Sequence, residues 1–521
     1  MKILSFLIHI LIYIIIFFVL YRLIKSSARI YFKKQRILNL IYSGLFLLFV
    51  FLTVYMIYTE VMVSGQDFKT LKAVEDKRLW IKEKIINRGR ILDRNNRVIA
   101  GNEKDGLYSS RYYLDRESFV HLVGFSSEKR KLRTGLEQTY NNWLNGEPEG
   151  FNFLWNWNLF KNMFFNLKAE GNDLKLTIDA DLQSYLYDQF NLKPGSAVGI
   201  NPRTGEILFI VSSPGYSEDL FSNKYDYLME NNCFLFRPVR GRFEPGSTFK
   251  VIVTAAAIEN DFEDFTITDT KKGFTPPGSN RPIFNHNHEV FGLTGLKRAL
   301  KKSSNVYFAQ LGLQLGPEKV YEYAEKFFFN DELKINSGKN IFKIDRGVFP
   351  SIKELSPVNL AWASIGQSSI ITTPFNMAVT ASIIANEGKY CTPYIEMGKG
   401  KKEKRIIEKK TAEKIKWMMF EVVGNPVDGL TGPLNWEDRE NYGTGYNARV
   451  RGVLLAGKTG TAENPHGEAH SWFIGFAPAD DPVIAFAVLL EHAGTGGEGA
   501  AKFTKNLIEK AKELGYFEKN E

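Results

Sequence analysis

The segment that most constrains the fold is residues 248–259, which carry apolar side chains on almost every side of the helix that their composition predicts. A helix that is apolar all round is normally buried in the middle of a domain. Pro245-Gly246 interrupts regular structure before it, so the helix should begin directly after this pair. We therefore expect a central buried helix with the other elements of a large domain packed around it.

Two polar side chains, Ser247 and Lys250, stand at the start of this apolar helix. Their i, i+3 spacing places them on one face of the helix, one turn apart. Burial lowers the pKa of an amine, so a neutral Lys250 could accept the proton of the Ser247 hydroxyl. The pair therefore predicts a nucleophile beside a base. The alternative interpretation is a helix-capping serine and a lysine that extends to the surface, because the S-x-x-K pattern often occurs by chance.

The length of 521 residues predicts two or three domains, and 44% hydrophobic with 24% charged residues is typical of globular protein with a sizeable core. The net charge of +9 comes from basic residues spread along the chain, with one concentration at 22–36, and no basic-aromatic pattern indicates nucleic-acid binding. The two cysteines, Cys233 and Cys391, form no metal or redox motif. Whether they pair is left open, because sequence does not show proximity.

Two apolar runs, 3–21 and 37–58, begin the chain. Each is long enough to cross a hydrocarbon core of about 30 Å as a helix rising about 1.5 Å per residue. The short loop between them is rich in Lys and Arg, and such loops stay in the cytoplasm. We expect residues 1–60 to be a membrane anchor of two transmembrane helices, with the rest on the outer side of the cell membrane, periplasmic or extracellular. A cleaved signal peptide and a cytoplasmic enzyme with an anchor are the alternatives.

The rest of the chain divides at about residue 172, where the pattern of apolar and polar residues changes. Residues 61–172 predict a small β-rich domain with a hairpin at 88–100, turned by Asn95-Asn96. Residues 173–521 predict a larger domain whose sheet is built from both ends of the segment, with helices between. The expected strands are 174–179, 196–200, 206–211, 453–461, 472–477 and 483–491, and the expected helices are 180–190, 248–259, 296–313, 356–365 and 501–514.

Three short motifs follow one another in the larger segment: Ser247-x-x-Lys250, Ser303-x-Asn305 and Lys458-Thr459-Gly460. Each motif alone is weak evidence, but the ordered set with these separations is strong. The set resembles that of class B penicillin-binding proteins, which are monofunctional peptidoglycan D,D-transpeptidases. The resemblance runs from about residue 85 to the end of the chain.

Further segments are similar to this family, some to its pedestal and some to its transpeptidase scaffold. They are Arg88-Gly89, Asp93-Arg94 and Gly135-Leu136-Glu137 for the pedestal, and 176–179, 364–367, 458–463 and 472–476 for the scaffold. The chain departs from the family in its two apolar runs where one is usual, its short pedestal, and Ser471 where a small residue such as Ala is expected. These departures leave the subfamily open.

The resemblance implies an α+β fold. Residues 173–521 would form a serine β-lactamase/transpeptidase-like domain, in which helices flank an antiparallel sheet. Residues 61–172 would form a small, β-rich, non-catalytic pedestal, preceded by the N-terminal transmembrane helices. No cofactor and no metal are implied, and the pair His286 and His288 lacks further metal ligands nearby.

The resemblance also implies roles for the first two motifs, and these agree with the physical interpretation of Ser247 and Lys250. Ser247 attacks the carbonyl of a D-Ala-D-Ala peptide bond and forms an acyl-enzyme, with Lys250 as the general base. Ser303 relays a proton toward the leaving D-Ala. Asn305 holds Lys250 and the amide of the donor peptide by hydrogen bonds.

The third motif is implied to bind the substrate. Lys458 keeps the site positive, Thr459 binds the substrate carboxylate, and Gly460 lies in the same strand. The backbone N–H groups of Ser247 and Thr461 form the oxyanion hole, where one donor stabilises the transition state by about 3–4 kcal/mol.

The implied partners are peptidoglycan stem peptides that end in D-Ala-D-Ala, β-lactam antibiotics, the membrane, and a separate SEDS-type glycan polymerase. A separate polymerase is expected because residues 61–172 leave too little room for a glycosyltransferase domain.

Two other classes of protein use the same nucleophile. A membrane-anchored serine β-lactamase or a D,D-carboxypeptidase would pass the acyl group to water. A β-lactam sensor would use the fold for binding, but the loop at 22–36 is too short for the cytoplasmic protease of the known sensors. A long-lived penicilloyl adduct favours the transpeptidase, and rapid turnover of penicillin favours a hydrolase.

Overall fold

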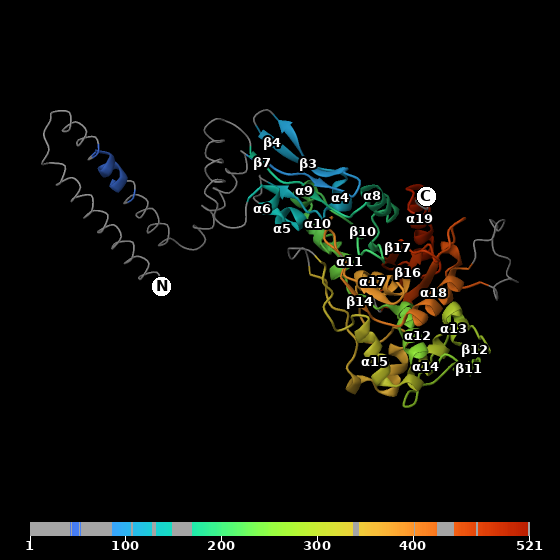
Figure 1. Cartoon of the computed structure of the whole chain (residues 1–521). Helices are drawn as coiled ribbons and strands as arrows, with labels where there is room; N and C mark the ends of the chain where they lie inside the picture. Colours follow the sequence, from blue (N-terminus) through green and yellow to red (C-terminus); the bar gives the residue numbers. More distant parts are fainter. Residues whose placement is uncertain are drawn as a thin grey trace, which may run out of the picture. The chain divides into compact units, whose positions relative to one another are not determined.

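The computed structural model describes residues 42, 44–51, 53, 86–105, 108–127, 132–147, 169–336, 343–400, 402–424, 442–464 and 467–518. The chain forms two compact units, Met1–Ile81 and Lys82–Glu521 (Figure 1). Each unit is described by itself below.

In the first unit, the described residues 42, 44–51 and 53 are helical, and their large apolar side chains are exposed except that of Phe46, which is half-buried. The expected transmembrane run 3–21 lies outside the described residues, and the run 37–58 lies only partly within them. No helix in the described part of the chain combines the length and the apolar character that a membrane crossing requires. The transmembrane helices therefore stay a prediction.

The second unit is built on a five-stranded antiparallel sheet in the order β10-β9-β17-β16-β15. The strands are β9 (Gly195–Ile200), β10 (Ile207–Ser213), β15 (Ala456–Ala462), β16 (His470–Ala477) and β17 (Ile484–Leu490). β17 pairs with β9 on one side and with β16 on the other. The two ends of the segment thus form one sheet, as the sequence predicts, and the fold is α+β.

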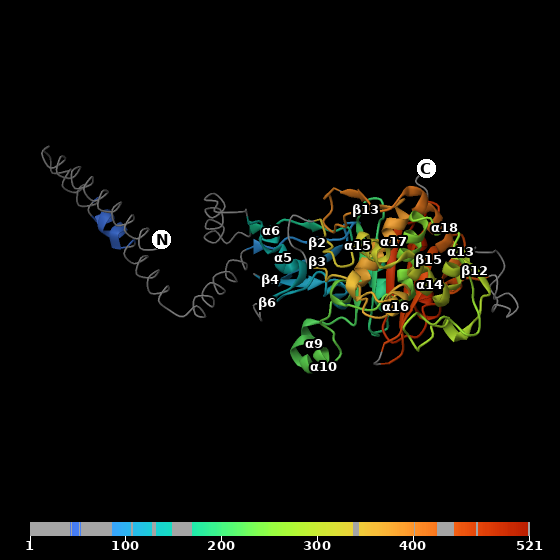
Figure 2. The ribbon, with the colours of Figure 1, turned by 90° about the horizontal axis from the view of Figure 1, so that it is seen from below.

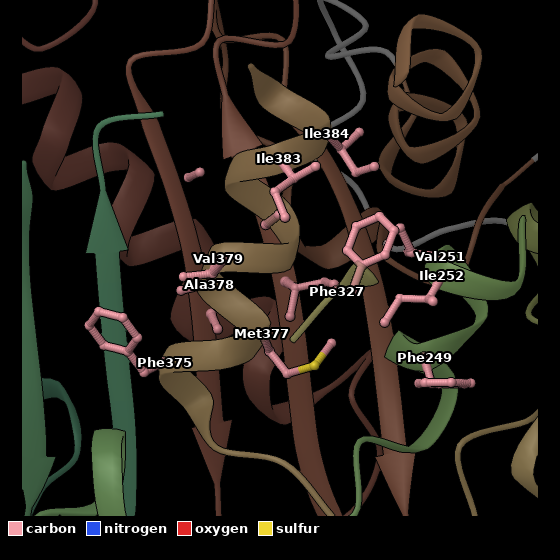
Figure 3. Close-up of a cluster of buried hydrophobic side chains, with 14 of the residues drawn as sticks. Phe249, Val251, Ile252, Phe327, Phe375, Met377, Ala378, Val379, Ile383 and Ile384 are labelled. Atoms are coloured by element: carbon pink, nitrogen blue, oxygen red, sulfur yellow. The ribbon is translucent and has the colours of Figure 1, made fainter. Parts of the chain in front are cut away.

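Helices cover both faces of this sheet, because successive side chains along a strand point to opposite faces. α17 (Pro374–Ala385) and α18 (Lys409–Val423) pack on one face, in the cluster that contains Val198 and Ala487. α8 (Ala180–Gln189) and α19 (Gly499–Glu513) pack on the other face, in the cluster that contains Phe209 and Phe486. Every residue of α17 is buried, and Figure 3 shows its side chains in the core together with those that begin α12.

The predicted central helix is α12 (Lys250–Glu259), whose residues from Lys250 to Ile258 are all buried. A 3-10 turn, η1 (Gly246–Phe249), leads into it. α12 is enclosed by α18, α13 (Leu296–Lys302), α14 (Asn305–Leu315) and α15 (Pro317–Lys326). An apolar surface on every side of this helix is therefore matched by neighbours on every side.

The single helix expected over 296–313 is wrong, because the structure has α13 and α14 with a break between them. Ser303 adopts a left-handed φ of 56°, which ends α13. The Ser304 side chain accepts a hydrogen bond from Tyr307 N at 3.1 Å and so caps α14. The break places the Ser303-x-Asn305 motif in a turn.

The strand expected over 174–179 is shorter than predicted, since the ladder of β8 contains only Leu174–Lys175. Asp179 is instead the N-cap of α8, where its side chain accepts a hydrogen bond from Leu182 N at 3.0 Å. A capping aspartate requires the chain to leave the strand before the helix begins.

A four-stranded sheet in the order β4-β3-β2-β8 lies in the N-terminal part of the second unit. Its other strands are β2 (Ile91–Leu92), β3 (Val98–Asp105) and β4 (Tyr108–Tyr113). The hairpin predicted at 88–100 is confirmed, because β2 and β3 are antiparallel. β8 belongs to this sheet although it follows residue 172, so the sheet does not mark the boundary that is expected there between pedestal and catalytic domain. That boundary stays a prediction.

The other elements of the described ranges are short. They are β1 (Ile86–Asn87), β5 (Ser126–Ser127), β6 (Leu132–Arg133), β7 (Ala169–Glu170), β11 (Thr266–Thr268), β12 (Leu293–Gly295), β13 (Lys389–Cys391), β14 (Glu403–Arg405), α4 (Arg116–Phe119), α5 (Gly135–Thr139), α6 (Asn141–Leu144), α9 (Glu218–Asn223), α10 (Tyr225–Glu230), α11 (Arg237–Arg240), α16 (Pro357–Ala363), η2 (His286–His288), η3 (Ile352–Glu354) and η5 (Tyr446–Ala448). Figure 2 shows α9 and α10 standing out from the second unit. Cys233 and Cys391 are buried thiols and form no disulfide with each other.

Candidate active site

Ser247 lies in η1, directly before α12. The preceding Gly246 has a left-handed φ of 52°, and a Cβ atom there would lie 2.5 Å from the carbonyl oxygen of Thr461. Gly246 also donates its N–H to the carbonyl of Gly366 at 3.0 Å. Only glycine allows the backbone at Ser247 to approach β15 this closely in this conformation.

Lys250 is the first residue of α12, and its side chain is fully buried. Its Nζ atom lies 2.9 Å from Ser247 Oγ. Nζ donates hydrogen bonds to Asn305 Oδ1 at 2.6 Å and to the carbonyl oxygen of Ser303 at 2.7 Å. A neutral amine has two N–H donors and one lone pair, so these two bonds leave the lone pair for the Ser247 proton. The geometry is that of a general base beside a nucleophile.

The electrostatics favour a neutral amine at Lys250. Burial lowers the pKa of Lys250 well below its ordinary value, and the nearby charge of Lys458 lowers it further. Burial lowers the pKa of Lys458 to about 7. Because two like charges in one buried site repel, Lys250 is kept neutral when Lys458 carries the proton.

Ser303 lies between the two amines. Lys458, on β15, donates from Nζ to Ser303 Oγ at 2.8 Å and to the Thr459 carbonyl oxygen at 2.8 Å. Ser303 Oγ is 3.4 Å from Lys250 Nζ on its other side. The hydroxyl can therefore receive a proton from one neighbour and pass one on.

Asn305 begins α14 and joins the same cluster. Its Nδ2 donates to the carbonyl oxygen of Phe284 at 3.0 Å, so its Oδ1 faces Lys250. Asn285 supports the turn, because its Oδ1 accepts from Asn305 N at 2.8 Å and from Ser304 Oγ at 3.0 Å. The sequence does not reveal this role, since nothing local marks a side chain that acts on residues twenty positions later. Across the described residues, no group of three or more side chains could hold a metal ion, near His286 or elsewhere.

The expected oxyanion donors, the N–H groups of Ser247 and Thr461, come from η1 and from β15, which pack against each other. β15 is an edge strand that pairs only with β16 in this sheet, so part of its backbone is left to bind other groups. Gly460 faces Trp472 across the strands, and a Cβ atom there would lie 2.8 Å from the Thr248 side chain. A larger residue at 460 would push η1 away from β15.

Thr444 is a polar neighbour of the third motif and belongs to none of the three motifs. Its Oγ1 lies 2.6 Å from Thr459 Oγ1. His470 lies further along the site edge, where its Nδ1 accepts from His492 N at 3.2 Å and its ring packs on Phe243 at 5.4 Å. The contacts of His470 are those of a structural residue, whereas Thr444 touches a residue expected to bind the substrate.

Comparison with known proteins gives one matching family and several relatives. The family model described as the penicillin binding protein transpeptidase domain matches residues 195–509, which contain all three motifs. The peptidoglycan D,D-transpeptidase MrdA of Acinetobacter baumannii is 27% identical over 441 residues, which cover 75% of this chain and 64% of that protein. The peptidoglycan D,D-transpeptidase PbpA of Mycolicibacterium smegmatis is 28% identical over 468 residues, covering 83% and 90%. The match thus spans slightly less than two thirds of the first relative.

Solved structures of similar fold include penicillin-binding protein A from M. tuberculosis as its penicillin G acyl-enzyme complex, with a TM-score of 0.68 and 26% identity. That likeness covers 82% of this chain and 100% of the other. A D,D-transpeptidase domain from Eggerthella lenta has a TM-score of 0.68 and 28% identity, covering 83% and 99%. The similarity therefore extends well beyond the segment that carries the motifs.

Proposed function

This chain belongs to the penicillin-binding protein transpeptidase family, and from that premise we propose that it is a peptidoglycan D,D-transpeptidase acting through Ser247. The substrate is a stem peptide that ends in D-Ala-D-Ala, and the product is a cross-link to a second stem peptide. The observation that best supports this is the 2.9 Å separation of Lys250 Nζ and Ser247 Oγ in a buried site. The names of the relatives, which are peptidoglycan D,D-transpeptidases, support the same activity.

Acylation begins when Ser247 Oγ attacks the carbonyl carbon of the penultimate D-Ala and Lys250 Nζ takes the hydroxyl proton. The carbonyl oxygen gains negative charge and accepts hydrogen bonds from the N–H groups of Ser247 and Thr461. The C–N bond then breaks, and a proton passes through Ser303 Oγ to the departing D-Ala amine. Lys458 donates to Ser303 Oγ and keeps that hydroxyl in place for the transfer.

Transfer uses the same groups in reverse order. The amine of a second stem peptide attacks the ester carbonyl and loses its proton to Lys250. Lys250 then returns a proton to Ser247 Oγ as the C–O bond breaks. One peptide bond is broken and one is formed, so no cofactor is consumed. A β-lactam undergoes the first step alone and remains attached to Ser247, which is the state of the M. tuberculosis neighbour.

A serine β-lactamase or a D,D-carboxypeptidase would share this acylation step and differ only in the acceptor. A β-lactam sensor would stop at the acyl-enzyme. Among the described residues, no contact at the site favours water over an amine as acceptor, whereas the relatives named above are transpeptidases. The transferase is therefore the function that the family and the geometry support best.

We also propose that the runs 3–21 and 37–58 hold the enzyme in the cell membrane, with the residues after 58 on the outer side. The basic loop at 22–36 supports this orientation. A protease added to intact spheroplasts should then degrade the second unit, and protection of that unit from the protease would contradict the orientation.

We further propose that a separate SEDS-type polymerase supplies the glycan strands, because residues 61–172 are too few for a glycosyltransferase domain.

Labelling with fluorescent penicillin tests the acylation half of the proposal. The full-length chain in detergent should form a long-lived adduct at Ser247, located by mass spectrometry of the labelled peptide. Ser247→Ala and Lys250→Ala should lose the label, whereas Ser110→Ala, which removes an exposed hydroxyl on β4, should keep it. Label on Ser247→Ala, or fast release of the penicilloyl group by the natural chain, would refute the proposal.

A further inference from the structure

The hydroxyls of Thr444 and Thr459 are in direct contact, with their Oγ1 atoms 2.6 Å apart. Oxygen atoms of two hydrogen-bonded hydroxyls usually lie about 2.7–2.8 Å apart, so this contact is a close hydrogen bond. Thr459 is 5% exposed and follows Lys458 on β15. Thr444 lies outside the three motifs, on the segment that precedes β15.

Proton counting gives this contact a direction once a substrate is bound. Each threonine hydroxyl has one proton to donate and two lone pairs to accept with. A carboxylate only accepts, so Thr459 must give its single proton to the substrate carboxylate. The bond between the two threonines then requires Thr444 to be the donor and Thr459 the acceptor. Thr444 thereby fixes the rotation of the Thr459 hydroxyl.

Thr444 is held from a different part of the fold than Thr459. Its backbone N–H donates to the carbonyl oxygen of Lys301 at 3.3 Å, and Lys302 Nζ donates to the carbonyl oxygen of Tyr442 at 3.1 Å. The next residue, Gly445, donates its N–H to the carbonyl oxygen of Val422 at 2.9 Å. The segment is thus tied to the end of α13 and to α18. Because α13 ends at the Ser303 turn, these contacts join the second motif to the third.

We propose that Thr444 is a positioning residue for substrates with a terminal carboxylate: it donates to Thr459 and so turns the Thr459 proton toward that carboxylate. The assignment rests on the proposed function, since it presumes that Thr459 binds the carboxylate of a stem peptide or a β-lactam. It adds to the binding site a residue that none of the three motifs contains.

A double-mutant cycle on the full-length chain tests the assignment, with the second-order rate constant for acylation by penicillin G as the readout. Thr444→Val keeps the shape of the side chain and removes its hydroxyl. We expect this rate constant to fall about tenfold or more in Thr444→Val, which is the factor expected when a hydrogen bond that supports a charged partner is lost. Thr459→Val should lose at least as much. The double variant should be no slower than Thr459→Val, because Thr444 acts only through Thr459.

A rescue variant and a control variant distinguish a loss of positioning by Thr444 from a loss of folding. Thr444→Ser, which restores a hydroxyl, should recover most of the rate. Thr268→Val, which removes an exposed hydroxyl on β11, should leave the rate unchanged. Thr444→Ala gives the same test if the valine variant does not fold.

The outcomes distinguish the two proposals. A natural chain that penicillin G does not acylate would overturn the proposed function, and with it this assignment. A natural chain that is acylated, with losses at Thr444 and Thr459 that multiply or with no loss at Thr444, would overturn the assignment of Thr444 alone.

Discussion

Lys250 acts as a base only while its amine is neutral, and the charges buried around it decide at which pH that holds. Burial and Lys458 together hold the pKa of Lys250 below its ordinary value. The rate of acylation by penicillin should therefore rise with pH as Lys250 loses its proton, with a midpoint well below the lysine reference of about 10.4. Lys458→Met removes the neighbouring charge, so the rise should move to higher pH. Stopped-flow measurement of acylation across pH gives both profiles.

Lys410→Met is the matched control for this profile, because Lys410 lies on α18 with 75% of its side chain exposed. Its profile should match that of the natural chain. A rise at the same pH in Lys458→Met and in the natural chain would contradict the electrostatic link between the two amines.

Lys458 also links folding stability to pH. Its pKa is about 7 in the folded chain, against a reference of about 10.4 in the unfolded chain. Between these values the unfolded chain binds a proton at Lys458 that the folded chain does not, so the contribution of Lys458 to stability rises with pH from about 7 to about 10 and is constant below 7. In Lys458→Met the melting temperature should rise less steeply over this range, since only Lys250 of the two site lysines still contributes. Equal slopes in thermal scans of the two proteins would contradict the lowered pKa of Lys458.

Among the elements, η1 depends most on its distance from β15. Gly246 and Gly278 both have a left-handed φ, of 52° and 84°. A Cβ atom at 246 would lie 2.5 Å from Thr461 O, whereas one at 278 would meet nothing within 4 Å. Gly278→Ala should cost about 1 kcal/mol of unfolding free energy and leave acylation unchanged. Gly246→Ala should cost more and slow acylation strongly, because the methyl group pushes Ser247 away from β15. Thermal melts and penicillin labelling measure the two effects, and equal behaviour of the two variants would contradict this view of η1.

Elements marked by local sequence could be predicted, and those set by distant contacts could not. The burial of α12 follows from its composition, and the hairpin at 88–100 follows from Asn95-Asn96 between apolar ends. The break at Ser303 is not predicted, because the turn is held by Asn285 from another segment. α17 is not predicted either: it is buried on every side and so shows no amphipathic period, and Asn376, Thr380 and Ser382 interrupt the apolar composition that marks α12.

The same distinction applies to the site. The residues of the three motifs are identifiable in the sequence because their spacing is short and their order is fixed. Thr444 and Asn285 contact the motif residues only in the folded chain. Asn285 lies twenty positions before Asn305, and no sequence motif marks Thr444. The sequence therefore predicts which residues react better than it predicts which residues hold them in place.

At the scale of the whole molecule, stability depends on a buried charge cluster remote in sequence from the motifs. Glu137 is fully buried, with Arg88 and Arg111 each 2.7 Å from its carboxylate. Burial alone would raise the pKa of Glu137, but the two guanidinium groups hold it below its ordinary value. The contribution of Glu137 to stability is therefore complete above its pKa in the unfolded chain, about 4.3, and is lost as the pH falls through its pKa in the folded chain. Glu137→Gln should cost about 3–5 kcal/mol at neutral pH, since it leaves two largely buried cations without a carboxylate.

Urea denaturation measures this loss, and an exposed ion pair provides the control. Arg90 and Asp173 lie 2.6 Å apart with 56% and 37% of their side chains exposed. Asp173→Asn should cost less than about 1 kcal/mol. The folded Glu137→Gln protein should still react with penicillin at the natural rate, because Glu137 does not contact the site residues. A cost no larger than that of Asp173→Asn would show that the cluster does not stabilise the fold.

The central claim is that the acyl group on Ser247 passes to an amine of a second stem peptide. The direct measurement supplies the full-length chain in detergent with polymerised, uncross-linked glycan strands and analyses the digested product by mass spectrometry. We predict cross-linked muropeptide dimers and released D-Ala from the natural chain, and neither product from Ser247→Ala. Dimers formed by Ser247→Ala, or shortened monomers without dimers from the natural chain, would contradict the claim.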